Sequence, residues 1–197
     1  MKTIQRYILY SIIMENKLKF KKREPPKIES VYSRCLLSRT ITLPITAIGN
    51  DLNTTLVKTI IAAYEGRCVV EGYIKPDSCN IITYSSGLNK GGNVLFEVVF
   101  ECQVCFPVES MLIECVAKNI TKAGIRAESS KESPSPIIVF IAKDHNYNVP
   151  EFSEIKEGDV FTTRVIGQRF ELNDKYISII GEIAKPKKTH AFTAKNR

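Results

Sequence analysis

The sequence predicts an α+β protein in which a small β-α-β-β-β unit is followed by a five-stranded β-barrel. Three observations lead to this prediction. One segment with helical periodicity lies early in the chain, short runs rich in β-branched residues follow it, and loops rich in Gly, Pro and Ser separate these runs. The 197 residues, 44% of them hydrophobic and 25% charged, suffice for one large or two small domains and need no disulfide to hold a core.

The first half combines one helix with four strands. A strand is expected over residues 35–46, where apolar and polar residues alternate over much of the segment. The turn Gly49-Asn50-Asp51 holds an N-cap candidate for a helix over residues 52–64, and Gly66 ends that helix. Three further strands are expected after the helix, at residues 67–74, 80–84 and 93–106.

The second half shows no helical periodicity of comparable length. Five β runs are expected there, with a hairpin turn at residues 121–124 and a polar Ser/Pro-rich loop at residues 129–136. Five short strands with variable loops favour a small closed barrel, of which the OB-fold is the commonest type. The five runs are residues 111–120, 124–128, 137–142, 159–170 and 176–183.

The basic charge lies at the two ends of the chain. The net charge is +7, but residues 1–28 carry +6, residues 185–197 carry +5 and residues 29–184 carry −4. Basic tails on an acidic body commonly contact nucleic acid or an acidic partner, although they also serve simply as solubilising ends. The predicted organisation is a basic arm, a first domain, a barrel domain and a basic tail, at residues 1–30, 31–107, 108–184 and 185–197.

The cysteines and the apolar runs indicate a protein with free thiols and no membrane span. Six cysteines occur in a chain without a convincing signal peptide, which suggests a reducing compartment. The apolar run at residues 7–13 is too short for a signal sequence and runs into Lys-rich sequence. No stretch approaches the roughly 20 apolar residues that cross a bilayer, so no membrane partner is expected.

The residues that could carry catalysis are few. There are two histidines, and the sequence holds no Gly-x-Ser-x-Gly, P-loop or dinucleotide fingerprint. The glycine-rich stretch 87–92 precedes a strand, whereas phosphate-binding loops precede a helix, so it is interpreted as a hairpin tip. Glu97, Glu101 and Glu109 follow the polar side of one strand and are interpreted as a solvated face. No catalytic residue and no cofactor are expected.

The motif Cys102-Gln103-Val104-Cys105 has a spacing seen in metal sites. A structural zinc site needs a second pair of ligands and a turn that points both sulfurs the same way. Here the flanking residues predict a strand, which sends residues three apart to opposite faces. We therefore expect two thiols on a strand and no metal site, with Cys68 and Cys79 the only conceivable further ligands.

Binding of single-stranded RNA is the chemistry that the predicted barrel best supports. The outer face of an OB-type barrel stacks bases on aromatic rings while Lys and Arg neutralise phosphates. The alternative is that Phe140 belongs to the core and the cations are ordinary surface residues. The acidic body favours weak contact without sequence preference. The candidate residues are Lys118, Lys122, Arg126, Phe140, Lys143, His145 and Tyr147.

Several segments, taken in order, resemble one known family. They are the helix-to-strand junction 64–68, the domain junction 100–109, the barrel stretch 111–124, the third barrel strand 139–145 and the last hairpin 158–181. Over about residues 35–184 the chain is similar to the stalk subunit of multisubunit RNA polymerases, which is the seventh subunit of eukaryotic polymerase II or its archaeal counterpart. Residues 93–107 and 118–125 look most like the versions encoded by large DNA viruses.

The resemblance implies a non-catalytic subunit. Its first domain would dock on the polymerase clamp through the tip loop, and its barrel would contact nascent RNA near the exit path. The implied partners are the polymerase core subunits and a fourth-subunit-like stalk partner. The implied location is a virion and a cytoplasmic transcription site for a viral protein, and the nucleus otherwise. The docking residues are Ser86, Gly87, Leu88, Asn89, Lys90, Gly91 and Gly92.

Two other functions stay open at this point. A free-standing OB-type factor of translation or RNA decay would bind RNA without a polymerase. A redox enzyme built on Cys102 and Cys105 would need an exposed thiol of low pKa, which placement on a strand disfavours.

Overall fold

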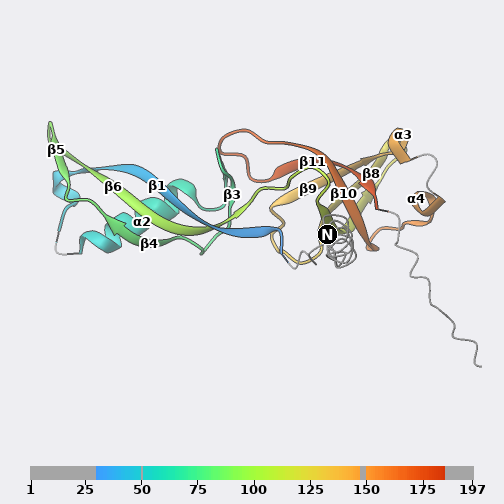
Figure 1. Cartoon of the computed structure of the whole chain (residues 1–197), viewed down its shortest axis with the longest axis horizontal. Helices are drawn as coiled ribbons and strands as arrows, with labels where there is room; N and C mark the ends of the chain where they lie inside the picture. Colours follow the sequence, from blue (N-terminus) through green and yellow to red (C-terminus); the bar gives the residue numbers. More distant parts are fainter. Residues whose placement is uncertain (1–29, 50, 147–149, 185–197) are drawn as a thin grey trace, which may run out of the picture.

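The computed structural model describes residues 30–49, 51–146 and 150–184. The predicted basic tail, and the predicted basic arm apart from residue 30, lie outside these residues. The molecule is elongated, with a six-stranded sheet at one end and a closed five-stranded barrel at the other (Figure 1). This arrangement confirms the predicted α+β class with a barrel in the second half. In the described residues, no helix is long and apolar enough to cross a membrane.

The sheet holds the predicted β-α-β-β-β order with two differences. The expected strand 67–74 is two short strands joined by a tight turn, and the glycine-rich stretch contains an additional strand, β5. The elements are β1 (Tyr32–Pro44), a 3-10 turn (Ile45–Ala47), α2 (Leu52–Tyr64), β2 (Cys68–Val69), β3 (Gly72–Ile74), β4 (Asn80–Tyr84), β5 (Leu88–Lys90) and β6 (Asn93–Cys105).

The 13-residue strand β6 is the centre of the sheet. Along one edge it pairs with β1 over its whole length, from Asn93 opposite Pro44 to Cys105 opposite Tyr32, without a register shift. Along the other edge it pairs in turn with β5, β4 and β3. These two long antiparallel strands in continuous register form a twisted ribbon that extends from the tip to the barrel (Figure 1).

Helix α2 covers one face of this ribbon. Asp51 caps the helix, because its side chain accepts a hydrogen bond from the backbone N–H of Thr54. Leu56 and Ile60, four residues apart, are fully buried against the alternate residues of β1 and β6 that point to the same face. The ring of Tyr64 stacks on Phe100 with 6.0 Å between centroids. The helix therefore forms the core of the sheet half.

The second sheet is a closed barrel in the order β10-β11-β9-β8-β7. Strands β9 and β11 pair in parallel, and β10 closes the barrel against β7. Two short helices follow β9, and the sequence did not predict them. The elements are β7 (Leu112–Ile120), β8 (Gly124–Ser129), β9 (Ile137–Ala142), α3 (Lys143–Asn146), α4 (Pro150–Glu154), β10 (Val160–Arg169) and β11 (Ile177–Ile183). The barrel interior is filled by buried aliphatic side chains, chiefly Ile113, Ile125, Ile137, Val139, Ile141, Ile177 and Ile179.

The sheet and the barrel are joined by a shared core and by backbone bonds. Tyr73 and Cys105 of the sheet belong to the same buried cluster as the barrel interior. Between β2 and the β10–β11 loop, Cys68 donates its N–H to Asp174 (2.8 Å) and accepts from the N–H of Asn173 (2.9 Å). We propose that residues 31–107 and 108–184 are two domains, and these contacts fix one against the other.

The side chain of Glu65 holds the end of α2 to the turn before β4. Its carboxylate accepts hydrogen bonds from three successive backbone N–H groups, those of Asp77 (2.9 Å), Ser78 (3.1 Å) and Cys79 (2.8 Å). Three convergent donors form a small anion-binding nest, which this carboxylate occupies. The nest is a structural feature that connects the helix to the base of the β4–β6 segment.

Glu65→Ala removes this acceptor and leaves three backbone donors without a protein partner. A hydrogen bond to a charged group contributes more to folding stability than one between neutral groups. We therefore expect the free energy of unfolding to fall by about 1–3 kcal/mol. Urea denaturation followed by circular dichroism measures the change. Glu109→Ala, at an exposed carboxylate on the junction segment, is the control, and an equal loss in both variants would contradict this role of Glu65.

Candidate nucleic-acid interface and docking tip

The tip of the sheet is a hairpin, as the interpretation of the glycine-rich stretch predicted. Within it lies the additional strand β5, in which Leu88 and Lys90 pair with Leu95 and Asn93 of β6. Both central residues of the two-residue turn, Gly91 and Gly92, have positive φ (57° and 84°). Such turns match the twist of the flanking strands and strongly favour glycine. The predicted docking residues therefore lie on a twisted strand and its turn at the far end of the molecule (Figure 1).

The tip is held at its base by close contacts. Ser85 donates its N–H to the carbonyl of Glu97 (2.9 Å), and its hydroxyl accepts from the N–H of Glu97 (3.0 Å). Gly87 lies so close to β6 that a Cβ there would come within 2.3 Å of Val94 and 2.7 Å of the Phe96 ring. The hairpin beyond this point is solvent-facing, and Leu88 exposes 68% of its surface. The tip thus presents an apolar side chain on a well-fixed support.

On the barrel, three outward-facing side chains form a row across β8, β9 and β11. Arg126 is paired with Phe140, and Phe140 is paired with Ile180. Phe140 is 46% exposed and Ile180 is 53% exposed. Phe140 is therefore a surface residue, and the alternative that placed it in the core is wrong. Gly167 continues the row on β10 and leaves the space above it open.

Ile180 was not among the residues singled out from the sequence. The signal that could have found it is the alternation along β11, where Ile177, Ile179 and Ile183 are buried and Ile180 points outward. Ile180 and Phe140, directly opposite each other on neighbouring strands, form one exposed apolar surface. Such a surface suits stacking, which tolerates any base because every base has a π-face.

Three predicted lysines lie beside this row. Lys118 is the extra residue of a bulge in β7, Lys122 is in the β7–β8 turn, and Lys143 begins α3. The backbone N–H of Lys143 donates to the carbonyl of Ala123 (3.0 Å), which brings the start of α3 to that turn. All three side chains are exposed and make no ion pair with the residues that the structure describes. They are available to neutralise phosphates.

The surroundings of the row are not uniformly basic. Arg126 pairs with Glu128 at 3.2 Å, Asp144 follows Lys143, and Glu157 accepts a hydrogen bond from the backbone of Ile120. Carboxylates between the cations reduce the local positive potential. This surface therefore fits a weak, salt-sensitive contact with a phosphate chain better than a tight one.

Two predicted residues cannot be placed on this surface. The backbone of His145 belongs to α3, but its side chain lies outside what the structure describes, and Tyr147 lies outside the described residues. Their neighbour Asn146 is 1% exposed and joins two elements: its Nδ2 donates to the carbonyl of Ala142 (2.9 Å), and its Oδ1 accepts from the N–H of Ile183 (3.1 Å). This buried amide, which sequence reasoning missed, fixes α3 against β9 and β11.

The Cys102-x-x-Cys105 motif lies on a strand, as predicted, and its two thiols belong to different cores. Cys102 packs under α2, whereas Cys105 packs into the cluster shared with the barrel. They are 1% and 0% exposed, and burial raises the pKa of Cys105 to about 12. In the described part of the chain, no group of three His, Cys, Asp or Glu side chains is arranged to hold a metal ion. The motif offers neither a chelating pair nor an exposed thiol.

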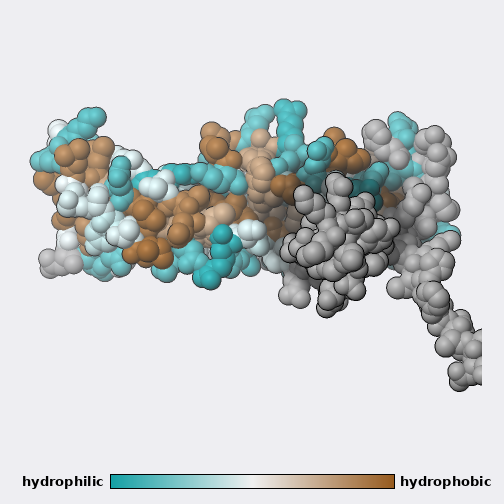
Figure 2. All heavy atoms as spheres, in the orientation of Figure 1, coloured by the Kyte–Doolittle hydropathy of each residue, from teal (hydrophilic) through white to brown (hydrophobic). Residues whose placement is uncertain are grey.

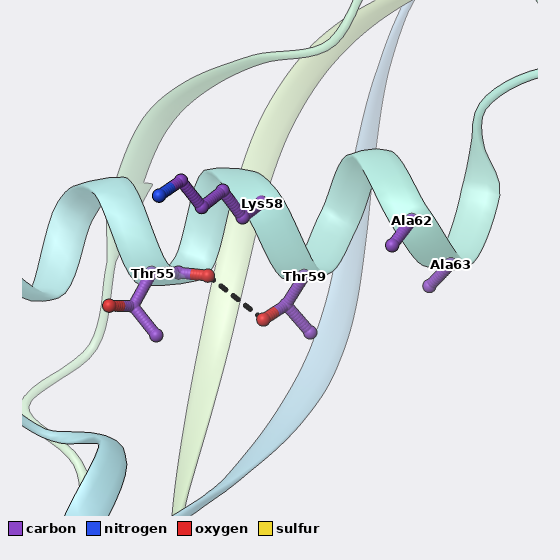
Figure 3. A pocket seen from close by; sticks show the side chains of 5 residues that line it. All are labelled: Thr55, Lys58, Thr59, Ala62 and Ala63. Atoms are coloured by element: carbon purple, nitrogen blue, oxygen red, sulfur yellow. Dashed lines mark hydrogen bonds between the residues drawn. The ribbon is translucent and has the colours of Figure 1, made fainter.

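Two shallow depressions lie on the sheet half. One runs along α2 and is lined by Thr55, Lys58, Thr59, Ala62 and Ala63, with the Thr59 hydroxyl donating to the carbonyl of Thr55 at 2.8 Å (Figure 3). The other lies near the barrel, where Arg39 pairs with Glu71 and stands 5.8 Å from the centre of the Tyr64 ring. The first depression has mostly small side chains, and in the second Arg39 and Glu71 neutralise each other, so neither points to a ligand chemistry.

The sheet half also carries exposed apolar surface. Figure 2 shows hydrophobic residues gathered over the half that contains α2 and β4. On these two elements Ile61 is 39% exposed and Ile82 is 55% exposed. Clustered exposed apolar residues of this kind are typical of protein–protein contact surfaces.

Three curated proteins show which chains this one is similar to. A protein of Acanthamoeba polyphaga mimivirus, named as DNA-directed RNA polymerase subunit L376, is 26% identical over 172 residues, which covers 79% of this chain and 83% of the relative. DNA-directed RNA polymerase II subunit 7 of Arabidopsis thaliana is 26% identical over 132 residues, and subunit RPB7 of Glycine max is 25% identical over 132 residues. Each plant match covers 66% of this chain and 70% of the relative.

No protein-family model matches the chain. The three relatives nevertheless share one description, and the mimivirus match agrees with the resemblance to viral versions seen in the sequence. The resemblance predicted from the sequence is thereby confirmed: the chain is similar to the seventh subunit of RNA polymerase II and to a mimivirus RNA polymerase subunit.

Proposed function

We propose that this protein is a non-catalytic subunit of a DNA-directed RNA polymerase, which docks on the polymerase clamp through its tip and holds nascent RNA on its barrel. The observation that carries the proposal is the similarity to named polymerase subunits over 172 residues. The location would be a viral transcription site or a nucleus, as for the mimivirus and plant relatives. A polymerase core, and a fourth-subunit-like protein beside it, would be the partners.

The form of the tip supports a docking role. It is a narrow hairpin with a fixed base and an exposed Leu88, and it lies at the opposite end of the molecule from the barrel (Figure 1). A protruding element with an apolar side chain can enter a pocket on a partner with little conformational cost, because its support is already ordered. Docking in this way would bias a mobile partner toward the conformation that contains the pocket.

The barrel supports contact with an emerging transcript. Bases would stack on the exposed side chains of Phe140 and Ile180, and Arg126 and the three exposed lysines would neutralise the phosphates. Nothing in this arrangement reads a base edge, so binding would follow the charge and the stacking rather than the sequence. Weak contact suits a strand that must move past the subunit as it is synthesised.

Removing the tip should separate polymerase binding from folding. A variant in which residues 86–93 are replaced by a shorter turn, or the point variant Leu88→Asp, is expected to lose polymerase subunits in affinity purification by at least about tenfold, because a charge cannot enter an apolar pocket without a partner. Circular dichroism and thermal melting should stay close to those of the parent protein.

The matched control for Leu88→Asp is Val160→Asp, at a residue that is 61% exposed on the barrel. It should retain polymerase subunits. Equal retention by both variants would contradict docking through the tip, and equal loss would indicate that any new surface charge disturbs the assembly.

Removing the three lysines should weaken RNA binding and its dependence on salt. With Lys118, Lys122 and Lys143 changed to Ala, the slope of log affinity against log salt concentration should fall by about 2, since each phosphate contact with a single strand contributes roughly 0.7. Fluorescence anisotropy with labelled oligouridine measures both quantities. Changing Lys58, Lys131 and Lys175, which are exposed elsewhere on the molecule, removes the same charge, and an equal effect there would contradict a localised site.

Removing the ring of Phe140 should weaken RNA binding without changing the salt slope. Loss of one stacked base costs about 1–3 kcal/mol, which is roughly a 5- to 150-fold loss of affinity. Tyr176→Ala is the matched control, because Tyr176 is 43% exposed and stands outside the row of Arg126, Phe140 and Ile180. The stacking role is contradicted if Phe140→Ala binds RNA as tightly as Tyr176→Ala.

A further inference from the structure

Three cysteines lie next to one another across the sheet. One is in β1, one is in β6, and the third directly precedes β4. Cys35 of β1 is directly opposite Cys102 of β6. On the other edge of β6, Asn80 is opposite Glu101, so Cys79, one residue earlier, faces Cys102 from the second side. Cys102 is therefore flanked by a thiol-bearing residue on both edges of its strand.

The three side chains point to the same face. Residues directly opposite each other in antiparallel strands share a face, and this face is the one that α2 covers. Cys102 is 1% exposed, and Cys35 and Cys79 are half-buried and pack against the same cluster. Hydrogen bonding to Cys102 raises the pKa of Cys79, and the same interaction lowers the pKa of Cys102, which agrees with this register.

The pairing distance suits a disulfide. Directly opposite residues in antiparallel strands have Cα atoms about 4.5–5.5 Å apart, and a disulfide spans Cα atoms about 4.4–6.8 Å apart. By register both neighbours of Cys102 meet this condition, but Cys35 is held within the uninterrupted β1–β6 ladder. Cys79 also lies just before β4, where its backbone N–H is held by Glu65 rather than by the ladder.

We propose that Cys79 and Cys102 are a reversible redox pair, which a peroxide converts to a disulfide that closes the base of the β4–β6 segment. One sulfur of the pair, as the thiolate, attacks a peroxide oxygen, breaks the O–O bond and becomes a sulfenic acid while hydroxide leaves. The second thiol then displaces water from the sulfenic sulfur. In sum, two thiols and one hydrogen peroxide give one disulfide and two waters.

The closed segment contains the tip. Residues 80–101 hold β4, β5, the glycine turn and most of β6, and the bond would join their two ends. A covalent link between strand ends removes open conformations of the enclosed chain, so the oxidised tip would fray less than the reduced one. This redox pair follows from the register of β6 with its two neighbours, and it does not depend on the proposed polymerase role.

The test uses the full chain at low micromolar concentration, treated with hydrogen peroxide, alkylated and digested with trypsin without reduction. Trypsin cleaves after Lys90, between the two cysteines, so the disulfide gives a linked peptide pair that tandem mass spectrometry assigns. We expect Cys79 linked to Cys102 as the main product, with the monomer retained on a non-reducing gel and the link reversed by dithiothreitol. A main product joining Cys35 to Cys102, a disulfide-linked dimer, or full alkylation of Cys79 would overturn the proposal.

Variants separate the pair from the other thiols. Cys79→Ser should abolish the linked peptide, whereas Cys35→Ser should retain it. Cys115→Ser is the matched control, since Cys115 is fully buried in the barrel and burial raises its pKa to about 12. Hydrogen exchange over residues 80–101 should slow at least about threefold on oxidation of the parent and of Cys115→Ser, and should not change in Cys79→Ser. Unchanged exchange in the oxidised parent would overturn the closure of the tip segment.

Discussion

The continuous pairing of β1 with β6 is the constraint on which the rest of the structure depends. Thirteen successive residue pairs without a bulge keep the side-chain alternation constant from the tip to the barrel. On β6 this alternation buries Phe96, Val98 and Phe100 under α2, and the end of the strand delivers Cys105 to the core shared with the barrel. A shift of one residue would turn the whole buried set to solvent, so one register fixes the tip, the helix and the barrel together.

This register also explains the separation of the two candidate sites. The tip hairpin is the distal end of β6, and the exposed row of Arg126, Phe140 and Ile180 is on strands that begin only after β6 has ended. Backbone bonds from Cys68 to the β10–β11 loop, together with Tyr73 in the shared core, hold the two ends in one relative position. The tip and the barrel surface are therefore held at a fixed distance from each other.

The sequence predicted the elements with strong local signals. The helix 52–64 was predicted at its observed bounds, because its apolar spacing, cap and terminating glycine agree. Strand β5 was missed because Leu88-Asn89-Lys90 between glycines has little strand propensity, and α3 and α4 because four or five residues show no period. Ile180 and the Cys35–Cys102–Cys79 row depend on pairing between distant segments, which spacing along one strand does not reveal.

Affinity purification shows whether this chain works as part of a polymerase. The tagged full chain is purified from its native cells after nuclease treatment at moderate salt, and its partners are quantified by mass spectrometry. We expect the large polymerase subunits in near-stoichiometric amounts. Their absence, with RNA or ribosomal factors recovered only when nuclease is omitted, would contradict it and would indicate a free-standing RNA-binding protein.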